Sequence, residues 1–486
     1  MPVRGATRPG GRRHSGGGSD GSTSWPWLEL LRRPPRWLLG TAWLIIAVQL
    51  VTATGFLLAG TPGESERRGA DPGRAQGRGV SSIFDGTAPG GSSVDSAART
   101  KAVKALLATR AKAILARDRT AFLATVDPAA EPLRARQAAF FDNLAQLPLG
   151  TWSYQLDPDR ETLLPPGVAE AYGDAAWAPQ VRLRYGLDGY DTTPTTQEQR
   201  HLFVRVGERW YLADDGLSPR QETSSGTVRN LWDFGPVTVM SSPTVLVAGH
   251  PGSEALMRTV LGIAREAVPA VDGVWGTGWD RRVVVLVPAS GHELGRLVEE
   301  TGNLSRMAAF TSADVPHAGP PVGKRVLVNP DVFGTLSPFG QQVVLTHEIT
   351  HVATRHVTSA ETPYWLAEGF ADYVAYRATG ATARRAAREL SKDVQLGKLP
   401  ERLPQWSDFA VSNPRLSQAY QEAWLACRLI VERTDEETLV RLYHRLSRAG
   451  GDPEAALDVA LRDELGIGRD QFLATWRRYL KDELTP

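Results

Sequence analysis

The first long apolar stretch of the chain covers residues 37–60, where 24 consecutive residues carry no charge. A helix rises 1.5 Å per residue, so this stretch is long enough to cross a hydrocarbon core of roughly 30 Å. The apolar core of a signal peptide is shorter, about 7–15 residues. The flanking sequence is too polar to suggest a buried core helix. The pattern therefore predicts a transmembrane helix at residues 37–60.

The charges on the two sides of this stretch predict its orientation. Residues 1–36 contain seven arginines and two acidic residues, whereas residues 61–97 contain four arginines and five acidic residues, so the net charges are +5 and −1. Because positive segments stay in the cytoplasm, residues 1–36 are expected to form a cytoplasmic arginine-rich tail. We expect a single-pass protein of the cell membrane with its C-terminal domains extracellular. A tail that also binds an acidic partner is compatible with this orientation.

Residues 61–97 are rich in Gly, Ser and Pro, and they predict a flexible stalk. The next region has apolar positions at helical spacing in residues 98–116 and 131–146. Strand-like runs follow at 151–156, 180–186, 201–206 and 209–213, and Gly207-Glu208 between the last two is a hairpin signal. This order predicts an α+β domain at residues 98–225 that resembles the NTF2-like or cystatin-like cone. It contains no catalytic constellation, so a binding or spacing role is expected.

The remaining residues, 226–486, predict a second α+β unit that ends in a helical subdomain. Strand-like runs at 244–248, 282–287, 307–311 and 325–328 are interspersed with helical patterns at 253–268, 292–301, 339–356 and 363–377. Residues 380–482 are almost wholly helical by their period. Two or more domains are expected from the chain length alone.

Charge and cysteine content remove some classes of function. The chain has 55 basic and 54 acidic residues, so its net charge of +1 gives no general attraction to nucleic acid, and no nucleic-acid partner is expected. The single cysteine, Cys427, lies in an apolar helical stretch, which favours a buried small side chain over a reactive thiol.

Residues 343–356 read VVLTHEITHVATRH and contain the HExxH pattern. His347 and His351 are four residues apart, so a helix presents both imidazoles on one face, where they can bind one Zn²⁺. Glu348 lies between them and can take a proton from a water at the metal. A chance match on an amphipathic helix is the alternative, in which case no metal binds.

A second segment, YWLAEGFADY at 364–373, strengthens the interpretation. Glu368 lies 17 residues after His351, on a helix that Thr362 is expected to cap, and a turn between the two helices can bring its carboxylate to the same metal. Two histidines and one glutamate leave the fourth position open, as in catalytic zinc sites. Asp372 lies one turn beyond Glu368 and can accept the free N–H of a ligand imidazole. A solvated helix face is the alternative for both acids.

Together, HExxH, WLxEG and the following Asp resemble the gluzincin metallopeptidases, most closely the bacterial peptidase MA-like family. The resemblance covers about 240–482 and implies a zincin-like fold with His347, His351 and Glu368 as zinc ligands. It also implies that Glu348 is the general base and that Asp372 orients His347. An edge strand ahead of the motif helix is expected to pair with the substrate backbone, and residues 307–311 fit that position.

The same resemblance implies a tyrosine or histidine that stabilises the oxyanion of the tetrahedral intermediate. Tyr420 is the first candidate, with an aromatic packed between helices as the alternative. Three histidines are further candidates, each also readable as a solvated side chain: His317, His356 and His444.

The sequence thus predicts a membrane-anchored zinc metallopeptidase that hydrolyses peptide bonds of a peptide or protein substrate outside the cytoplasmic membrane. In this hypothesis, a water activated by zinc and Glu348 is the nucleophile. An anchored scaffold or receptor that binds zinc without turnover is the alternative, although a pure binding site has no use for the base Glu348.

Overall fold

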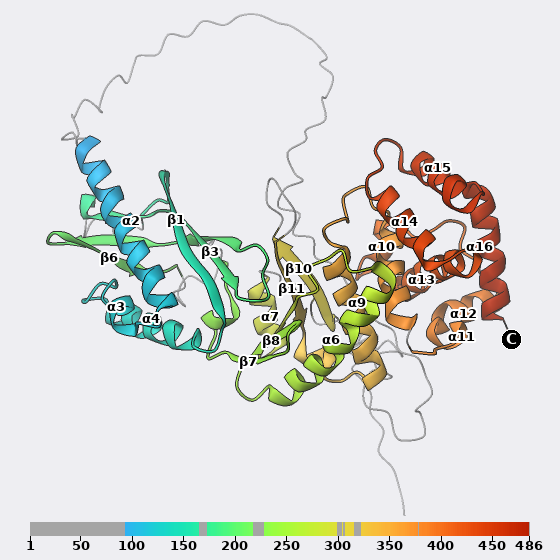
Figure 1. Cartoon of the computed structure of the whole chain (residues 1–486), viewed down its shortest axis with the longest axis horizontal. Helices are drawn as coiled ribbons and strands as arrows, with labels where there is room; N and C mark the ends of the chain where they lie inside the picture. The colour runs from blue at the N-terminus through green and yellow to red at the C-terminus, as the bar shows by residue number, and fades with distance from the viewer. Residues whose placement is uncertain are drawn as a thin grey trace, which may run out of the picture.

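The computed structural model describes residues 93–164, 173–216, 228–298, 304, 307–314, 322–377 and 379–485. The predicted transmembrane helix at residues 37–60, the arginine-rich tail and most of the stalk lie outside these residues. Within the described ranges, no helix combines the length and the apolar character that crossing a bilayer requires. Figure 1 shows an N-terminal part of helices and strands, a central sheet and a C-terminal group of helices. The α+β class predicted from the sequence is confirmed.

The N-terminal part packs three helices against antiparallel strands (Figure 1). The helices are α2 (Ser93–Leu115), α3 (Arg119–Leu123) and α4 (Glu131–Asn143). The strands are β1 (Leu149–Glu161), β2 (Ala176–Trp177), β3 (Pro179–Leu187), β4 (Thr195–Arg200), β5 (Leu202–Val206) and β6 (Arg209–Asp214). They form two sheets in the orders β1-β3-β4 and β2-β5-β6. The predicted hairpin is confirmed, because Val206 pairs with Arg209 and Gly207 has a φ of +58°.

Several details of this part differ from the sequence prediction, among them the unpredicted α3 and β2 and the greater length of β1. Helix α2 begins at Ser93, five residues before the predicted start. Small polar residues occur in linkers and in first turns of helices alike, so composition does not mark this boundary. Strand β4 was not predicted because its sequence, TTQEQR, has no apolar residue, although its burial alternates along the strand.

The central sheet has five strands in the order β10-β11-β9-β8-β7. They are β7 (Thr238–Ser241), β8 (Val245–Gly249), β9 (Val283–Val287), β10 (Ala309–Asp314) and β11 (Val322–Val328). The three inner strands run parallel, and β7 and β10 are antiparallel edges. Two of the inner strands, β8 and β9, are continuous apolar runs, as expected for strands buried on both faces. Strand β10 therefore lies at an edge, where the sequence placed residues 307–311.

The second part of the chain also contains the helices that surround or extend beyond the central sheet (Figure 1). They are α6 (Glu254–Trp275), α7 (Gly291–Leu297), α8 (Pro330–Phe333), α9 (Pro338–Thr354), α10 (Tyr364–Arg377), α11 (Ala383–Ala386), α12 (Arg388–Gln395), α13 (Leu416–Arg433), α14 (Glu436–Leu446), α15 (Pro453–Leu465) and α16 (Arg469–Leu484). Helix α9 packs against α6, α10 and strand β10, and α10 packs against α13. Short 3₁₀ turns are η2 (Gly173–Ala175), η4 (Leu231–Asp233) and η6 (Trp406–Phe409).

Helices α10 and α13 approach each other closely at Gly369. A Cβ added to Gly369 would lie 2.3 Å from the carbonyl oxygen of Ala423 and 2.9 Å from Sγ of Cys427. Only glycine fits at this helix crossing, because any side chain would clash with α13. Cys427 is fully buried there, which confirms its prediction as a core side chain.

Buried contacts connect the N-terminal part to the central sheet. Arg325 of β11 forms two hydrogen bonds with the carboxylate of Asp191, at 2.7 and 2.8 Å, and both side chains are largely buried. The hydroxyl of Tyr190 donates to the carbonyl of Ser242 at 2.7 Å. One apolar core also extends from Trp152 in β1 to the sheet and the C-terminal helices. The two parts are thus packed as one continuous body.

Candidate metal centre and active site

Helix α9 carries the HExxH residues and starts with a well-formed N-terminus. The side chain of Ser337 accepts a hydrogen bond from the backbone N–H of Gly340, and Pro338 occupies the first turn. From Val343 to Thr354 the helix is buried throughout. His347 and His351 lie on the same face with their Nε2 atoms 2.9 Å apart, and both are almost inaccessible to solvent.

Helix α10 places Glu368 opposite these two imidazoles. Its first intrahelical bonds run from the N–H groups of Leu366 and Ala367 to the carbonyl of Pro363. The expected cap, Thr362, has another role: its hydroxyl accepts from the backbone N–H of Ser359 and donates to Ser447. Thr362 thus fixes the turn that precedes the helix, and the prediction of a Thr362 side-chain cap was wrong.

The three side chains form a compact set of donor atoms. Oε2 of Glu368 lies 3.3 Å from Nε2 of His347 and 3.6 Å from Nε2 of His351, and the donor atoms of all three residues lie within 4.8 Å of one another. Two ligand atoms of a tetrahedral zinc site, each about 2.0–2.1 Å from the ion, are roughly 3.3 Å apart. The observed separations of 2.9, 3.3 and 3.6 Å scatter around that value.

The chemistry of the donor set also fits a cation. Neither carboxylate oxygen of Glu368 has a hydrogen-bond partner among the described residues, although both are buried. Burial would raise the pKa of Glu368, but the neighbouring imidazoles of His351 and His347 lower it to about 2. A buried anion without hydrogen-bond donors is costly unless a positive charge compensates it. A metal ion held jointly with the imidazoles would provide that charge.

Asp372 lies behind His347, on the side away from the donor set. Its Oδ1 is 2.8 Å from Nδ1 of His347. A carboxylate there accepts a hydrogen bond from Nδ1–H and leaves Nε2 with its lone pair directed to Glu368 and His351. Burial would lower the pKa of His347, but Asp372 and Glu368 raise it well above its ordinary value. The arrangement makes His347 a more basic, oriented ligand.

Glu348 lies next to the donor set and contacts the edge strand. The hydroxyl of Thr311, in β10, lies 2.8 Å from Oε2 of Glu348 and 3.0 Å from its backbone carbonyl. Oε1 of Glu348 has no hydrogen-bond partner among the described residues. Burial raises the pKa of Glu348, which makes the carboxylate a better proton acceptor.

Thr311 was not predicted as a site residue. It is the last residue of the MAAFT segment that the sequence assigned to an edge strand, and that assignment was the available signal. What the sequence could not reveal is that β10 crosses α9 at Glu348, because the crossing depends on the packing of the helix on the sheet.

Tyr420, the predicted oxyanion-stabilising residue, lies on α13 beside the donor set. Its ring centroid is 6.3 Å from that of His347 and 5.0 Å from that of Phe409. Burial and nearby carboxylates, first that of Glu368, raise the pKa of Tyr420 well above its ordinary value, so its hydroxyl stays protonated. Tyr420 is both packed between helices and adjacent to the site.

The histidine alternatives occupy other places. His356 and His444 both contact Trp275, with ring centroids 6.4 and 4.8 Å from that of the indole. His317 lies outside the described residues. Tyr364, which was not predicted, lies one helical turn before Glu368 on α10, on the face that carries the ligand.

No family model and no curated protein matches the chain. Among solved structures, it is similar to the M1 zinc metallopeptidase of Deinococcus radiodurans, with 14% identity and a TM-score of 0.31 over 64% of this chain. A point mutant of that enzyme matches with 16% identity and a TM-score of 0.32 over 50% of this chain. The matches span 62% and 52% of those proteins' chains, little more than half their length.

Proposed function

We propose that the chain is a zinc-dependent metallopeptidase. The observation that carries the proposal is the buried set of His347, His351 and Glu368, which has the spacing of a zinc site and the carboxylate of Glu348 beside it. A site that served only to hold a metal would not need a buried carboxylate with one oxygen free of hydrogen bonds next to the ion. The three residues supply three ligands and leave a fourth position for water or substrate.

The substrate is a peptide or a protein segment in extended conformation. Among the strands that the structure describes, β10 has a neighbour on one side only, so the other side of its backbone can pair with a further strand. Because Thr311 of β10 contacts Glu348, a peptide paired with β10 passes directly beside the base. Backbone pairing positions the scissile amide without requiring a particular side chain.

In amide hydrolysis at this site, the metal and the side chains of the protein have different tasks. Zn²⁺ in such a site supplies Lewis acidity, which polarises the scissile carbonyl and lowers the pKa of water to about 7. Glu348 accepts a proton from the attacking water, whose oxygen forms a bond to the carbonyl carbon. When the C–N bond breaks, Glu348 gives the proton to the leaving nitrogen. The products are a carboxylate end and an amine end.

Tyr420 stabilises the negative charge that develops on the carbonyl oxygen. Its phenol remains protonated at neutral pH because its pKa is raised, so it can donate a hydrogen bond. Its place beside His347 puts it next to the donor set. Removal of one such donor in other enzymes costs about 10²–10³ in kcat.

The cellular setting follows from the sequence. Residues 37–60 anchor the chain in the cell membrane with the amino terminus in the cytoplasm, and residues 98–486 act extracellularly. The N-terminal α+β part, which resembles the NTF2-like cone, either recognises a partner or serves as a spacer between the membrane and the peptidase part. The competing function is a scaffold or receptor that holds zinc without turnover, and the experiment below separates the two.

The experiment measures zinc content and peptide cleavage on the full-length protein and its Glu348→Gln variant. We expect both to hold one zinc per chain, while cleavage of a broad peptide library falls by about 10²–10⁴-fold in the variant, because the proton acceptor is lost. Equal cleavage by the two proteins would remove Glu348 from the mechanism. Zinc binding without cleavage by the wild type would favour the scaffold.

A further inference from the structure

A series of aromatic rings leads from the donor set to the protein surface. Tyr420 lies beside His347, and Phe409 lies 5.0 Å from Tyr420 between ring centroids. Tyr364 is 4.9 Å from Phe409 and 5.0 Å from Trp406. Phe409 and Tyr420 are buried, whereas the side chain of Trp406 is 65% exposed. The series thus ends in a large indole that the fold itself leaves uncovered.

Tyr364 lies on the side of α10 that carries Glu368. Tyr364, Glu368 and Asp372 follow at intervals of four residues and therefore share one face of the helix. Burial and the carboxylates of Glu368 and Glu348 raise the pKa of Tyr364, which agrees with a place near both groups. Trp406 packs on Tyr364 edge to face, so Tyr364 connects the exposed indole to the helix face that carries Glu368.

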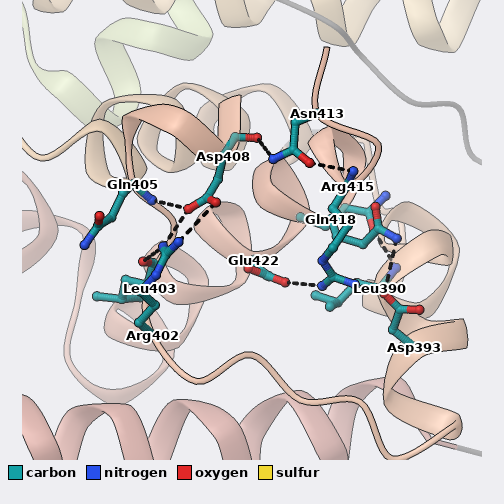
Figure 2. Close-up of polar contacts among 11 residues, drawn as sticks. Leu390, Asp393, Arg402, Leu403, Gln405, Asp408, Asn413, Arg415, Gln418 and Glu422 are labelled. Carbon is teal, nitrogen blue, oxygen red and sulfur yellow. Dashed lines mark hydrogen bonds and ion pairs between the residues drawn. The ribbon is translucent and has the colours of Figure 1, made fainter. Parts of the chain in front are cut away.

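A network of hydrogen bonds fixes the segment that presents Trp406 (Figure 2). Arg402 forms two bonds to the carboxylate of Asp408, at 2.6 and 3.2 Å. Asp408 also accepts from the backbone N–H of Gln405 at 2.7 Å, and its own carbonyl accepts from Asn413 at 2.8 Å. These hydrogen bonds connect residues on both sides of Trp406 in the sequence. They therefore fix the backbone at Trp406, even though nothing in the described part of the chain covers most of the indole.

A second group of bonds attaches the end of the same segment to two helices. Arg415 donates hydrogen bonds to Asp393 near the end of α12 and to Glu422 in α13, the latter at 3.1 Å (Figure 2). Arg402 is therefore paired with Asp408, and Arg415 with Asp393 and Glu422. What the segment offers to a ligand is the apolar surface of Trp406 and Tyr364.

We propose that Trp406, backed by Tyr364 and Phe409, forms a subsite that binds a bulky apolar side chain, preferably an aromatic one, of a substrate residue next to the scissile bond. This inference rests on the proposed peptidase function, because it places the substrate across the donor set. Exposed Trp and Tyr that lie on a rigid support are the residues that contribute most to binding interfaces. The subsite selects peptides by one aromatic residue, while pairing with β10 holds their backbone.

The test uses binding, so that it does not depend on turnover. Zinc-loaded full-length Glu348→Gln protein is titrated with fluorescent peptides that differ only in Phe or Ala, on either side of one central amide bond. We expect a Phe at one of the two positions to tighten binding about tenfold. In the Glu348→Gln background, Trp406→Ala should remove that preference and Trp406→Phe should restore most of it. Leu396→Ala, which removes another exposed apolar side chain at the end of α12, is the matched control and should leave it unchanged.

The outcomes distinguish this subsite from the peptidase function. If Trp406→Ala weakens the Phe and Ala peptides equally, or changes neither, the subsite is wrong even when the wild type cleaves peptides. If the Phe preference depends on Trp406 but the wild type cleaves none of the peptides, the subsite stands and the peptidase function falls. If no peptide binds, both are contradicted.

Discussion

At the scale of single residues, the candidate site is organised by short contacts to buried charged groups. Asp372 forms a hydrogen bond with the imidazole of His347, and Thr311 forms one with the carboxylate of Glu348. Both contacts involve a carboxylate inside the protein, where hydrogen bonds to charged groups contribute more than they do at the surface. Such residues are expected to affect catalysis without taking part in bond breaking.

Thr311 provides the sharpest prediction at this scale. Thr311→Val keeps the shape of the side chain but removes the hydroxyl that lies 2.8 Å from Glu348. A hydrogen bond to a charged group contributes about 1.5–3 kcal/mol, so kcat/KM should fall by roughly 10–100-fold. Thr311→Ser is the control and should retain most activity, and both variants should hold as much zinc as the wild type. Parental rates in Thr311→Val would show that the hydroxyl does not position Glu348.

The grouping of His347 with His351, and of Glu368 with Asp372, could be predicted from the sequence because the signals are local. Intervals of four residues on one helix place His347 with His351, and Glu368 with Asp372, whatever the rest of the fold is. Thr311 and Tyr364 could not be predicted as site residues in the same way. The place of each depends on which elements pack on α9 and α10.

At the scale of elements, the donor set depends on the spacing between α10 and its neighbours. Glu368 is followed by Gly369, where α13 approaches so closely that a methyl group has no space. The ligand and the helix contact are adjacent in sequence. A change in the contact therefore displaces the ligand.

Gly369→Ala tests this spacing. The added Cβ would overlap the Ala423 carbonyl, so the helices must separate, and overpacking of this kind costs about 1–3 kcal/mol. We expect a loss of that size in the free energy of unfolding in urea, together with weaker zinc binding. Gly262→Ala on the exposed face of α6, where nothing lies within 4 Å of the added Cβ, is the control and should be neutral or stabilising by up to about 1 kcal/mol. Equal stability of Gly369→Ala and the wild type would contradict the close contact.

Glu422, which forms a hydrogen bond with Arg415, makes the free energy of unfolding depend on pH. Burial raises the pKa of Glu422 from about 4.5 to about 7, although Arg415 opposes the shift and Asp408 and Asp393 add to it. Between those pH values the folded state holds a proton that the unfolded state has lost. Stability is therefore greatest below about pH 4.5 for this group and falls as the pH rises to about 7.

The measurement compares the wild type with Glu422→Gln in urea at pH 4 and at pH 8. A shift of this size corresponds to about 3 kcal/mol, so the variant should gain roughly that much relative to the wild type between the two pH values. A stability difference that is the same at both pH values would mean that Glu422 titrates normally in the folded protein.

At the scale of the whole molecule, the described residues form a continuous body from the N-terminal part to the C-terminal helices. The Asp191–Arg325 pair and the shared apolar core connect parts that the sequence predicts as separate domains. Helix and strand patterns gave most elements because apolar periodicity is a local property. The junction could not be predicted, since Asp191 and Arg325 are far apart in the chain and neither belongs to a motif. The strand β4 was missed because it contains no apolar residue.

The central claim is that His347, His351 and Glu368 hold one zinc ion, and the zinc-to-protein ratio tests it most directly. Elemental analysis of the purified full-length protein should give about one zinc per chain for the wild type and for His356→Ala, a control that removes an exposed histidine five residues beyond the motif. His351→Ala should bring the ratio close to zero, because two remaining ligands do not hold the ion. A wild type without zinc, or a His351→Ala variant that keeps the full ratio, would contradict the account.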